Sequence, residues 1–191
     1  MPSNRETAKA ERRSALLAAA ARLFAADGFH ATTLGAVAAE AGVSAPAVYR
    51  HFASKADLLA QMLVGASERL LDGGRAAAAE PSPLVALCAA HADFAVNERA
   101  VIRVQERELA SLEPNQRHRV RSLQAEYARL WIEALRPRLP AADEAELRLR
   151  VHAAFGLLNS TPHALRRSGA VADPVGLFTD LTVTALTAAR R

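Results

Sequence analysis

One stretch, residues 32–59, constrains the fold more than any other part of the chain. Apolar residues recur at helical spacing over 34–41, which predicts a short helix with one buried face. Gly42 follows directly, where a helix end often needs a left-handed backbone that glycine adopts at little cost. A second helical pattern begins shortly afterwards. The stretch therefore predicts two short helices joined by a tight corner.

The second helix of this corner has a clear start and a clear outer face. Ser44 is a good N-cap, and Pro46 falls in the first turn, where a nitrogen without a hydrogen costs little. Val48 and Phe52 are placed to point inward, so the Tyr-Arg-His run at 49–51 points outward. A DNA-binding helix-turn-helix puts the beginning of such a helix into the major groove. A bare helix–glycine–helix corner is also common in all-α proteins that have other roles.

The sequence motif extends well beyond a simple helix–glycine–helix corner. It runs T-T-L at 32–34, A-x-x-A-G-V-S at 38–44 and V-Y-R-H-F-x-S-K-x-D-L-L at 48–59. In this region the chain resembles the TetR/AcrR family of one-component bacterial repressors. The resemblance implies an all-α fold with an N-terminal three-helix helix-turn-helix DNA-binding domain, expected at 1–53. A C-terminal ligand-binding and dimerisation domain of about six helices is expected at 54–191.

The resemblance also assigns DNA-contacting positions. Those expected to touch the phosphate backbone are Thr33, Ser44, Tyr49, His51 and Lys55. Those expected to meet base edges are Ala45, Pro46, Ala47 and Arg50. The two alanines can offer only apolar contact to thymine methyl groups, which leaves Arg50 as the best candidate for bidentate reading of guanine. A grip on phosphate is the alternative role for Arg50.

Helical periodicity continues through the rest of the chain. With the two corner helices, we expect nine helices in all. The other seven are expected at about 5–27, 55–79, 84–95, 100–110, 114–135, 143–165 and 174–189. Gly73 and Gly74 are expected to loosen the helix over 55–79, and Pro162 to kink or end the one over 143–165. In the family that the chain resembles, the last two long helices pair with a second copy. Small residues that would permit such contact are Ala153, Gly156, Ala185 and Ala189.

Composition narrows the class of protein only modestly. The formal net charge is +4 and the pI is near 10, which favours a polyanionic partner. All basic residues except Lys9 and Lys55 are arginine, however, which the codon bias of a GC-rich genome also explains. The single Cys88 cannot form an internal disulfide. Because no signal peptide or membrane span is evident, we expect a cytoplasmic protein with no membrane partner.

The residues behind the corner suggest a binding pocket. Tyr127 and Trp131 lie one turn apart, and each brings a polar atom to an apolar helix face. Asn159 is a polar side chain on an otherwise apolar helix and needs a hydrogen-bond partner. The candidate ligand-contacting residues are Met62, Leu87, His91, Phe94, Leu123, Tyr127, Trp131, Phe155 and Asn159. Ordinary core packing is the alternative for each of them.

A cluster of arginines precedes this pocket in sequence. It comprises Arg103, Arg107, Arg117, Arg119 and Arg121. Together with Tyr127 and Trp131, the segment is similar to actinobacterial TetR-type regulators of lipid and sterol breakdown that sense acyl-CoA thioesters. Arginine suits phosphate because it can donate two parallel hydrogen bonds. Glutamates are interleaved with these arginines, so a solvated surface with salt bridges is an equally good interpretation of the segment.

These observations lead to one functional hypothesis and its alternatives. We expect a homodimeric transcriptional regulator, a repressor that leaves a palindromic operator when it binds a bulky apolar effector such as a fatty acyl-CoA. One alternative is a repressor of a drug-efflux pump that senses lipophilic compounds; another is an architectural DNA binder without a ligand. An enzyme is a remote alternative, because the sequence has no glycine-rich phosphate loop and no nucleophile or zinc motif. We therefore expect no catalytic residues, no metal and no cofactor.

Overall fold

The computed structural model describes residues 4–188, over which the chain forms only helices and their connections. The helices are α1 (Asn4–Asp27), α2 (Leu34–Glu40), α3 (Ala45–Val48), α4 (Lys55–Ala78), α5 (Pro83–Asn97), α6 (Arg99–Glu108), η1 (Leu109–Ser111), α7 (Pro114–Leu135), η2 (Arg136–Arg138), α8 (Glu144–Asn159), α9 (Thr161–Ser168) and α10 (Pro174–Thr187). The expected all-α class is confirmed. The expected domains also include residues 1–3 and 189–191, which lie outside the described range, as does Ala189.

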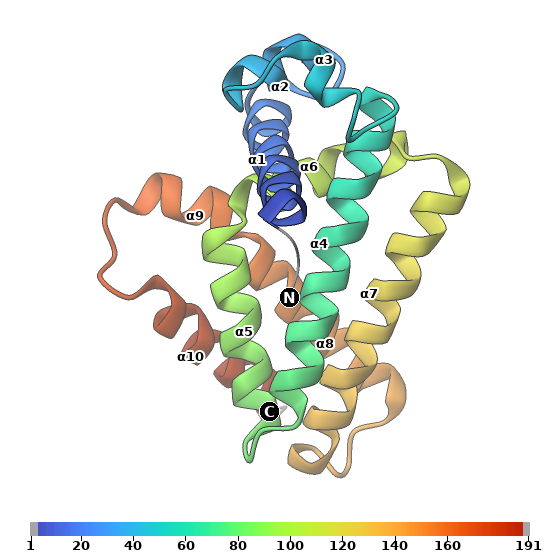
Figure 1. Cartoon of the computed structure of the whole chain (residues 1–191). Coiled ribbons are helices and arrows are strands. Elements are labelled where there is room, and N and C mark those ends of the chain that lie inside the picture. Colours follow the sequence, from blue (N-terminus) through green and yellow to red (C-terminus); the bar gives the residue numbers. More distant parts are fainter. Residues whose placement is uncertain (1–3, 189–191) are drawn as a thin grey trace.

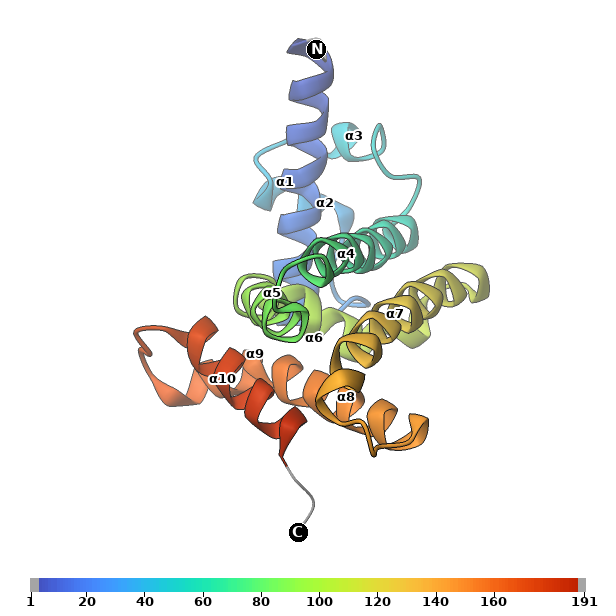
Figure 2. The same ribbon diagram turned by 90° about the horizontal axis from the view of Figure 1, so that it is seen from below.

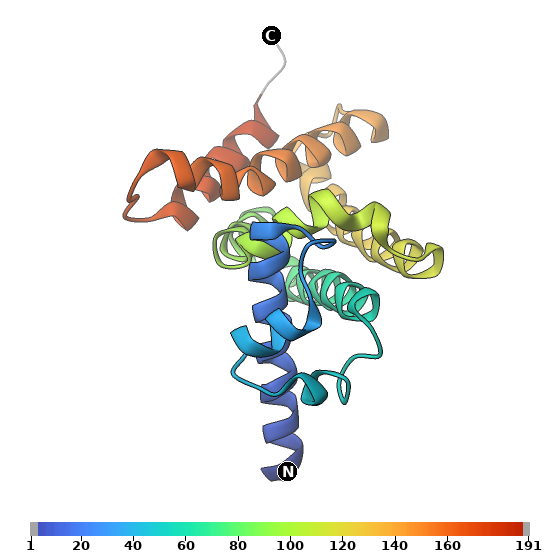
Figure 3. The same cartoon turned by 90° about the horizontal axis from the view of Figure 1, so that it is seen from above.

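The helices are arranged in three groups. Helices α1, α2 and α3 form a head at one end of the molecule, and α4, α5 and α7 run away from it side by side (Figure 1). Helices α8, α9 and α10 form a layer on the side farthest from the amino end of α1, with the central helices in between (Figures 2 and 3). The long central helices therefore connect the head to the outer layer.

Two apolar cores match this arrangement. The first joins α1 and the corner to α4, with Leu16, Phe24, Val48 and Phe52 almost completely buried. It continues into α6 through Val101 and Val104, so the head shares its core with the helices behind it. The second core holds α4, α5, α7, α8 and α10 together. Its largest fully buried side chain is Trp131.

The carboxyl-terminal half differs from the expectation in one respect. The single helix expected over 143–165 is two helices, α8 and α9, so the residues 4–188 contain ten α-helices rather than nine. The break lies at Ser160, because Pro162 falls in the first turn of α9 and has no N–H to donate one turn back. The N–H groups of His163 and Ala164 instead bond to the carbonyl of Ser160, at 2.9 and 3.0 Å.

No helix within residues 4–188 has an apolar stretch that would let it cross a membrane.

Candidate nucleic-acid interface and ligand cavity

The corner is held by local hydrogen bonds that its sequence prescribes. The Thr33 side chain accepts a hydrogen bond from the N–H of Ala36, at 3.1 Å, and so caps α2. Gly42 has a φ of 67°, the left-handed conformation expected after α2. The Val43 N–H then bonds to the carbonyl of Ala38, at 2.9 Å. The chain therefore turns sharply into α3. Ser44 occupies the N-cap position of α3 as expected, but its side chain makes no capping hydrogen bond.

The Tyr-Arg-His run at 49–51 forms an edge at the surface of the head. Tyr49 is 63% exposed, an unusual exposure for a large aromatic side chain. Its neighbour Arg50 is exposed, and His51 is half-buried. Among the other candidates, the exposed residues are Thr33, Ser44, Ala45 and Pro46, and the half-buried ones are Ala47 and Lys55. All nine residues are thus at least partly exposed, while their contacts with DNA stay a prediction.

Positive charge from α1 and from the turn after α3 converges on this edge. Partial burial lowers the pKa of His51, and the positive charges of four neighbouring side chains lower it further. Those neighbours are Lys9, Arg12, Arg13 and Arg50. Three of them come from the exposed amino-terminal half of α1. From sequence alone, these three residues could equally belong to a solvated helix face. The structure therefore places α1 charges beside the Tyr-Arg-His run, where an anionic partner would relieve their mutual repulsion.

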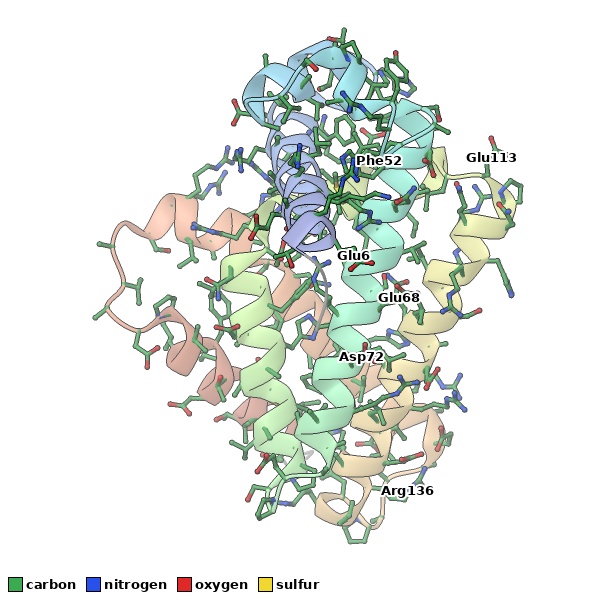
Figure 4. The ribbon with its side chains drawn as sticks, in the orientation of Figure 1. Glu6, Phe52, Glu68, Asp72, Glu113 and Arg136 are labelled. Atoms are coloured by element: carbon green, nitrogen blue, oxygen red, sulfur yellow. The ribbon has the colours of Figure 1, made fainter. Side chains whose placement is uncertain are left out.

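A hydrogen-bond network fixes the loop between α3 and α4. The Arg13 guanidinium donates to Gln61 Oε1, at 2.6 Å, and lies 5.7 Å from the centre of the Phe52 ring. The Gln61 amide donates in turn to both carboxylate oxygens of Asp57, at 3.0 and 2.9 Å. Phe52 lies between α1 and the start of α4 (Figure 4). The exposed edge is thereby tied to both α1 and α4.

Asp57 also completes the start of α4. The Ser54 hydroxyl accepts a hydrogen bond from the Asp57 N–H, at 3.0 Å, and the Asp57 carboxylate accepts one from the N–H of Ala53, at 2.9 Å. This reciprocal pair resembles a capping box, displaced by one residue at its outer bond. The entry into α4 is therefore rigid.

Lys55 has a structural role that sequence reasoning missed. Its ammonium group donates to the backbone carbonyls of Phe29, His30 and Thr32, at 2.8, 3.0 and 2.8 Å. It also lies 4.7 Å from the centre of the Phe29 ring, a cation–π distance. An ammonium group has three hydrogens to donate, and all three are used here. Lys55 thus clamps the α1–α2 loop to α4, and its predicted phosphate contact would require it to give up one of these bonds.

A cavity of about 910 Å³ lies behind the head, within the ~300–1,000 Å³ range of small-molecule sites. Residues of five helices, α4 to α8, line it. Six of the predicted ligand-contacting residues are in its wall: His91, Phe94, Leu123, Tyr127, Phe155 and Asn159. The other three lie outside the wall: Met62 in the head core, Leu87 and Trp131 in the second core. Ligand contact itself stays a prediction for all nine.

Four rings pack against one another at one side of this cavity. Those of His91, Tyr127, Trp131 and Phe155 lie 5.2–6.0 Å apart, centre to centre, in all six pairings. His91 is completely buried, and this burial lowers its pKa to about 4, so the imidazole is neutral near pH 7. Burial also raises the pKa of Tyr127. The cluster therefore offers polar atoms without charge.

Most of the arginines singled out by sequence are engaged away from the cavity. Arg119 pairs with Glu68, which projects from α4 toward α7 (Figure 4), at 3.1 Å. Arg117 donates to the carbonyl of Ala110, at 3.1 Å. Of the five arginines singled out by sequence, all of them among residues 4–188, Arg121 is the one in the cavity wall. The wall also contains Arg129 and Arg148, which sequence reasoning missed because they lie one or more turns further along α7 and on α8.

Helix α6 connects the cavity to the head. It contributes Val101, Ile102 and Gln105 to the cavity wall. Its end touches α1 and the following loop, because Arg107 donates to the carbonyl of Ala25 at 3.4 Å and the buried Glu108 accepts from the N–H of Phe29 at 3.5 Å. Phe29 is also held by Lys55. A displacement of α6 at the cavity would therefore reach the loop that positions α2.

Comparisons with known proteins agree with this geometry. Residues 16–62 match the family model described as bacterial regulatory proteins, tetR family. Residues 82–173 match the one described as tetracyclin repressor-like, C-terminal domain. The HTH-type transcriptional activator FasR of Mycolicibacterium smegmatis is 42% identical over 67 residues, which are 35% of this chain. The match covers 31% of FasR, so the similarity concerns about a third of that protein's length.

Solved structures are similar over nearly the whole chain. A TetR-family transcriptional regulator from Bordetella parapertussis 12822 has a TM-score of 0.79 and 25% identity, covering 91% of this chain and 93% of the other. The regulator FadR from Bacillus subtilis, in complex with stearoyl-CoA, has a TM-score of 0.69 and 16% identity. That comparison covers 91% of this chain and 97% of FadR and concerns the fold alone.

Proposed function

Because the chain belongs to the tetR family of bacterial transcriptional regulators, we propose that it is a homodimeric repressor that a bulky, largely apolar effector releases from a palindromic operator. The observation that carries this proposal is the path from the cavity through α6 to the α1–α2 loop. Val101 and Ile102 line the cavity, and Glu108, further along the same helix, holds the N–H of Phe29. An effector that fits better when α6 is displaced would shift the molecule toward the displaced state.

A fatty acyl-CoA is our candidate effector. The cavity wall combines apolar residues such as Leu70, Phe94 and Ile102 with Arg121, Arg129 and Arg148. The apolar part suits an acyl chain, and the guanidinium groups suit the phosphates of coenzyme A. The stearoyl-CoA complex of FadR, whose fold is similar, supports this choice. The two carboxylates in the same wall, Glu126 and Glu144, limit the net positive charge there.

A symmetric pairing through α8 and α10 would give two reading heads. Leu149 on α8 is 72% exposed, and Leu177 and Leu181 on α10 are each 48% exposed. Exposed apolar side chains at helical spacing on two adjacent helices are expected to be covered by a partner. The small residues Ala153 and Ala185 are exposed on the same helices and would let them approach closely.

One observation favours a second function. The FasR match is to a protein named a transcriptional activator. In that alternative the same head binds its operator and increases transcription, and the effector reverses the increase. The DNA-binding edge and the cavity would have the same roles in both cases.

The proposal is tested by capturing genomic fragments of the source organism on the purified protein and titrating a captured complex with stearoyl-CoA. Release of the DNA in proportion to the thioester supports the proposal. A lipophilic cationic dye in a parallel titration examines the efflux-pump alternative. DNA that stays bound at saturating concentrations of both compounds contradicts the proposed mode of regulation, and transcription from the captured promoter distinguishes repressor from activator.

A further inference from the structure

Two neutral polar side chains stand together in the cavity wall. His91 is on α5 and Asn159 ends α8, and His91 Nε2 lies 3.3 Å from Asn159 Oδ1. Both residues line the cavity. The His91 ring is enclosed by the rings of Tyr127, Trp131 and Phe155, whose polar atoms, Tyr127 Oη and Trp131 Nε1, carry no charge near pH 7.

The hydrogen bonds of this pair are incomplete. Because an amide oxygen can only accept, the neutral His91 ring carries its hydrogen on Nε2, and Nδ1 is left as an acceptor. His91 Nδ1 is buried without a hydrogen-bond partner. The Asn159 amide nitrogen has two hydrogens to donate and has no partner among residues 4–188. Polar groups removed from water are normally paired, so the half-buried Asn159 amide is a donor in the cavity wall without a partner among residues 4–188, whereas His91 Nδ1 is enclosed by protein.

The surroundings select a partner without charge. Arg148 is the cationic side chain of α8 in the cavity wall, and it lies about 16 Å along the helix axis from Asn159. Among residues 4–188, no hydrogen bond or ion pair joins a charged side chain to His91 or Asn159, so a carboxylate or ammonium group beside the pair would have no neutralising ion in contact with it. Burial of His91, which lowers its pKa to about 4, excludes an imidazolium as that ion near pH 7.

We propose that the His91–Asn159 pair recognises a neutral oxygen, either a carbonyl or a hydroxyl, carried within the apolar part of the effector. The proposal rests on the proposed function, in which the cavity holds the effector. The Asn159 amide donates to the oxygen, and His91 holds that amide in place through the bond from Nε2 to Asn159 Oδ1. A thioester carbonyl, a ketone and an alcohol qualify, whereas an unsubstituted hydrocarbon leaves the amide hydrogens unpaired.

Three ring compounds of nearly equal size test this inference: cyclooctane, cyclooctanone and cyclooctanol. Trp131 is the single tryptophan of the chain, and its ring centre lies 5.8 Å from that of His91, so its fluorescence reports binding. An indifferent apolar cavity would prefer cyclooctane, because it has the most apolar surface to remove from water. The proposal reverses that order, with the ketone and the alcohol bound about fivefold more tightly than the hydrocarbon, the effect of one net hydrogen bond.

Two variants assign the preference to the pair. Asn159→Leu and His91→Phe are expected to bind cyclooctane at least as well as the wild type and to lose the preference for the oxygenated compounds. Ser67→Ala is the matched control. Ser67 also lines the cavity, but its hydroxyl already donates to the carbonyl of Leu63 at 2.8 Å. This control should keep the preference, and thermal unfolding without ligand verifies that each variant is folded.

Three results would overturn the proposal: tighter binding of cyclooctane to the wild type, an unchanged preference in both pair variants, or no binding of any of the compounds. The first two would mean that ordered water or the protein itself satisfies the pair. These measurements need no DNA. A protein that bound no genomic fragment would contradict the proposed function. The order of its affinities for the three ring compounds would still decide the role of His91 and Asn159.

Discussion

The ring of Tyr127 on α7 packs directly against Gly74 on α4, at a point where no larger residue fits. A Cβ atom at position 74 would lie 2.8 Å from Tyr127 Cδ2 and closer still to Cε2. The expectation that Gly73 and Gly74 loosen this helix was wrong, because α4 is continuous from Lys55 to Ala78. Gly74 instead lets α4 and α7 approach closely beside the cavity.

Gly74→Ala and Gly73→Ala are therefore expected to change stability in opposite directions. At position 73 a new Cβ meets nothing within 4 Å, so the better helix propensity of alanine should raise the free energy of unfolding by about 0.5–1 kcal/mol. At position 74 the Tyr127 ring must move, which should lower it by about 1–3 kcal/mol. Urea unfolding of both variants measures the difference. Stabilisation by Gly74→Ala would show that Tyr127 does not depend on this contact.

Lys55→Met is expected to loosen the head. It leaves three backbone carbonyls without their donor, and one unsatisfied buried group costs about 1–3 kcal/mol. Hydrogen exchange should become faster in the α1–α2 loop, and DNA affinity should fall because α2 is no longer held. Lys9→Met is the control. Lys9 is exposed, so its loss should weaken DNA binding by charge alone. If Lys55→Met weakened DNA binding with no change in exchange or stability, Lys55 would be a phosphate contact instead of a clamp.

The parts of the fold that follow from near neighbours in sequence could be predicted. Thr33 and Ser54 each precede a helical pattern, where a hydroxyl can accept from an N–H a few residues later, and both side chains make those bonds. Gly42 was expected to have a positive φ, which it has. Asp173 likewise caps α10, with Pro174 in the first turn. Each of these features depends on the chemistry of a few consecutive residues.

Features that depend on distant residues could not be predicted in this way. The carbonyls that bind Lys55 lie on a loop more than twenty residues earlier, and no local pattern brings them to it. The ion pair of Arg119 with Glu68 of α4 joins residues 51 positions apart in sequence. The wall position of Arg148 depends on how α8 crosses α7. Periodicity assigned Trp131 correctly to a buried face, but it does not distinguish a core from a cavity wall.

Stability is expected to fall in mild acid because of His91. The unfolded chain protonates this residue as the pH falls through 6.5, whereas the folded chain does so only near 4. Between these values the unfolded state binds more protons, so the free energy of unfolding rises with pH and is fully regained above about 6.5. At pH 5 this single residue should cost about 2 kcal/mol.

Unfolding in urea at pH 7 and at pH 5 isolates this effect. The variant His91→Phe should lose less stability between the two pH values than the wild type does. His118→Gln, which alters an exposed histidine, should keep the pH dependence of the wild type. Equal pH dependence in all three proteins would show that His91 takes up its proton while folded.

The proposed dimer depends on the exposed leucines of α8 and α10. Leu181→Asp places a charge where the partner helix would pack and is expected to weaken dimerisation by about 30-fold or more. Val85→Asp is the control, because Val85 is 41% exposed but lies on α5, outside the proposed interface. Analytical ultracentrifugation measures both. A Leu181→Asp protein that sedimented as the wild-type dimer would place the interface elsewhere.

The central claim is that the Tyr-Arg-His edge of the head binds duplex DNA. Fluorescence anisotropy with a labelled genomic fragment captured by the protein tests it most directly, using Tyr49→Ala and Arg50→Ala beside the control Arg166→Ala, an exposed residue of α9. We expect Arg50→Ala to lose about 1–3 kcal/mol of binding free energy if Arg50 reads a base. Tyr49→Ala should also weaken binding, and the control should bind as the wild type does. Wild-type affinity in both head variants, with folded protein, would contradict the claim.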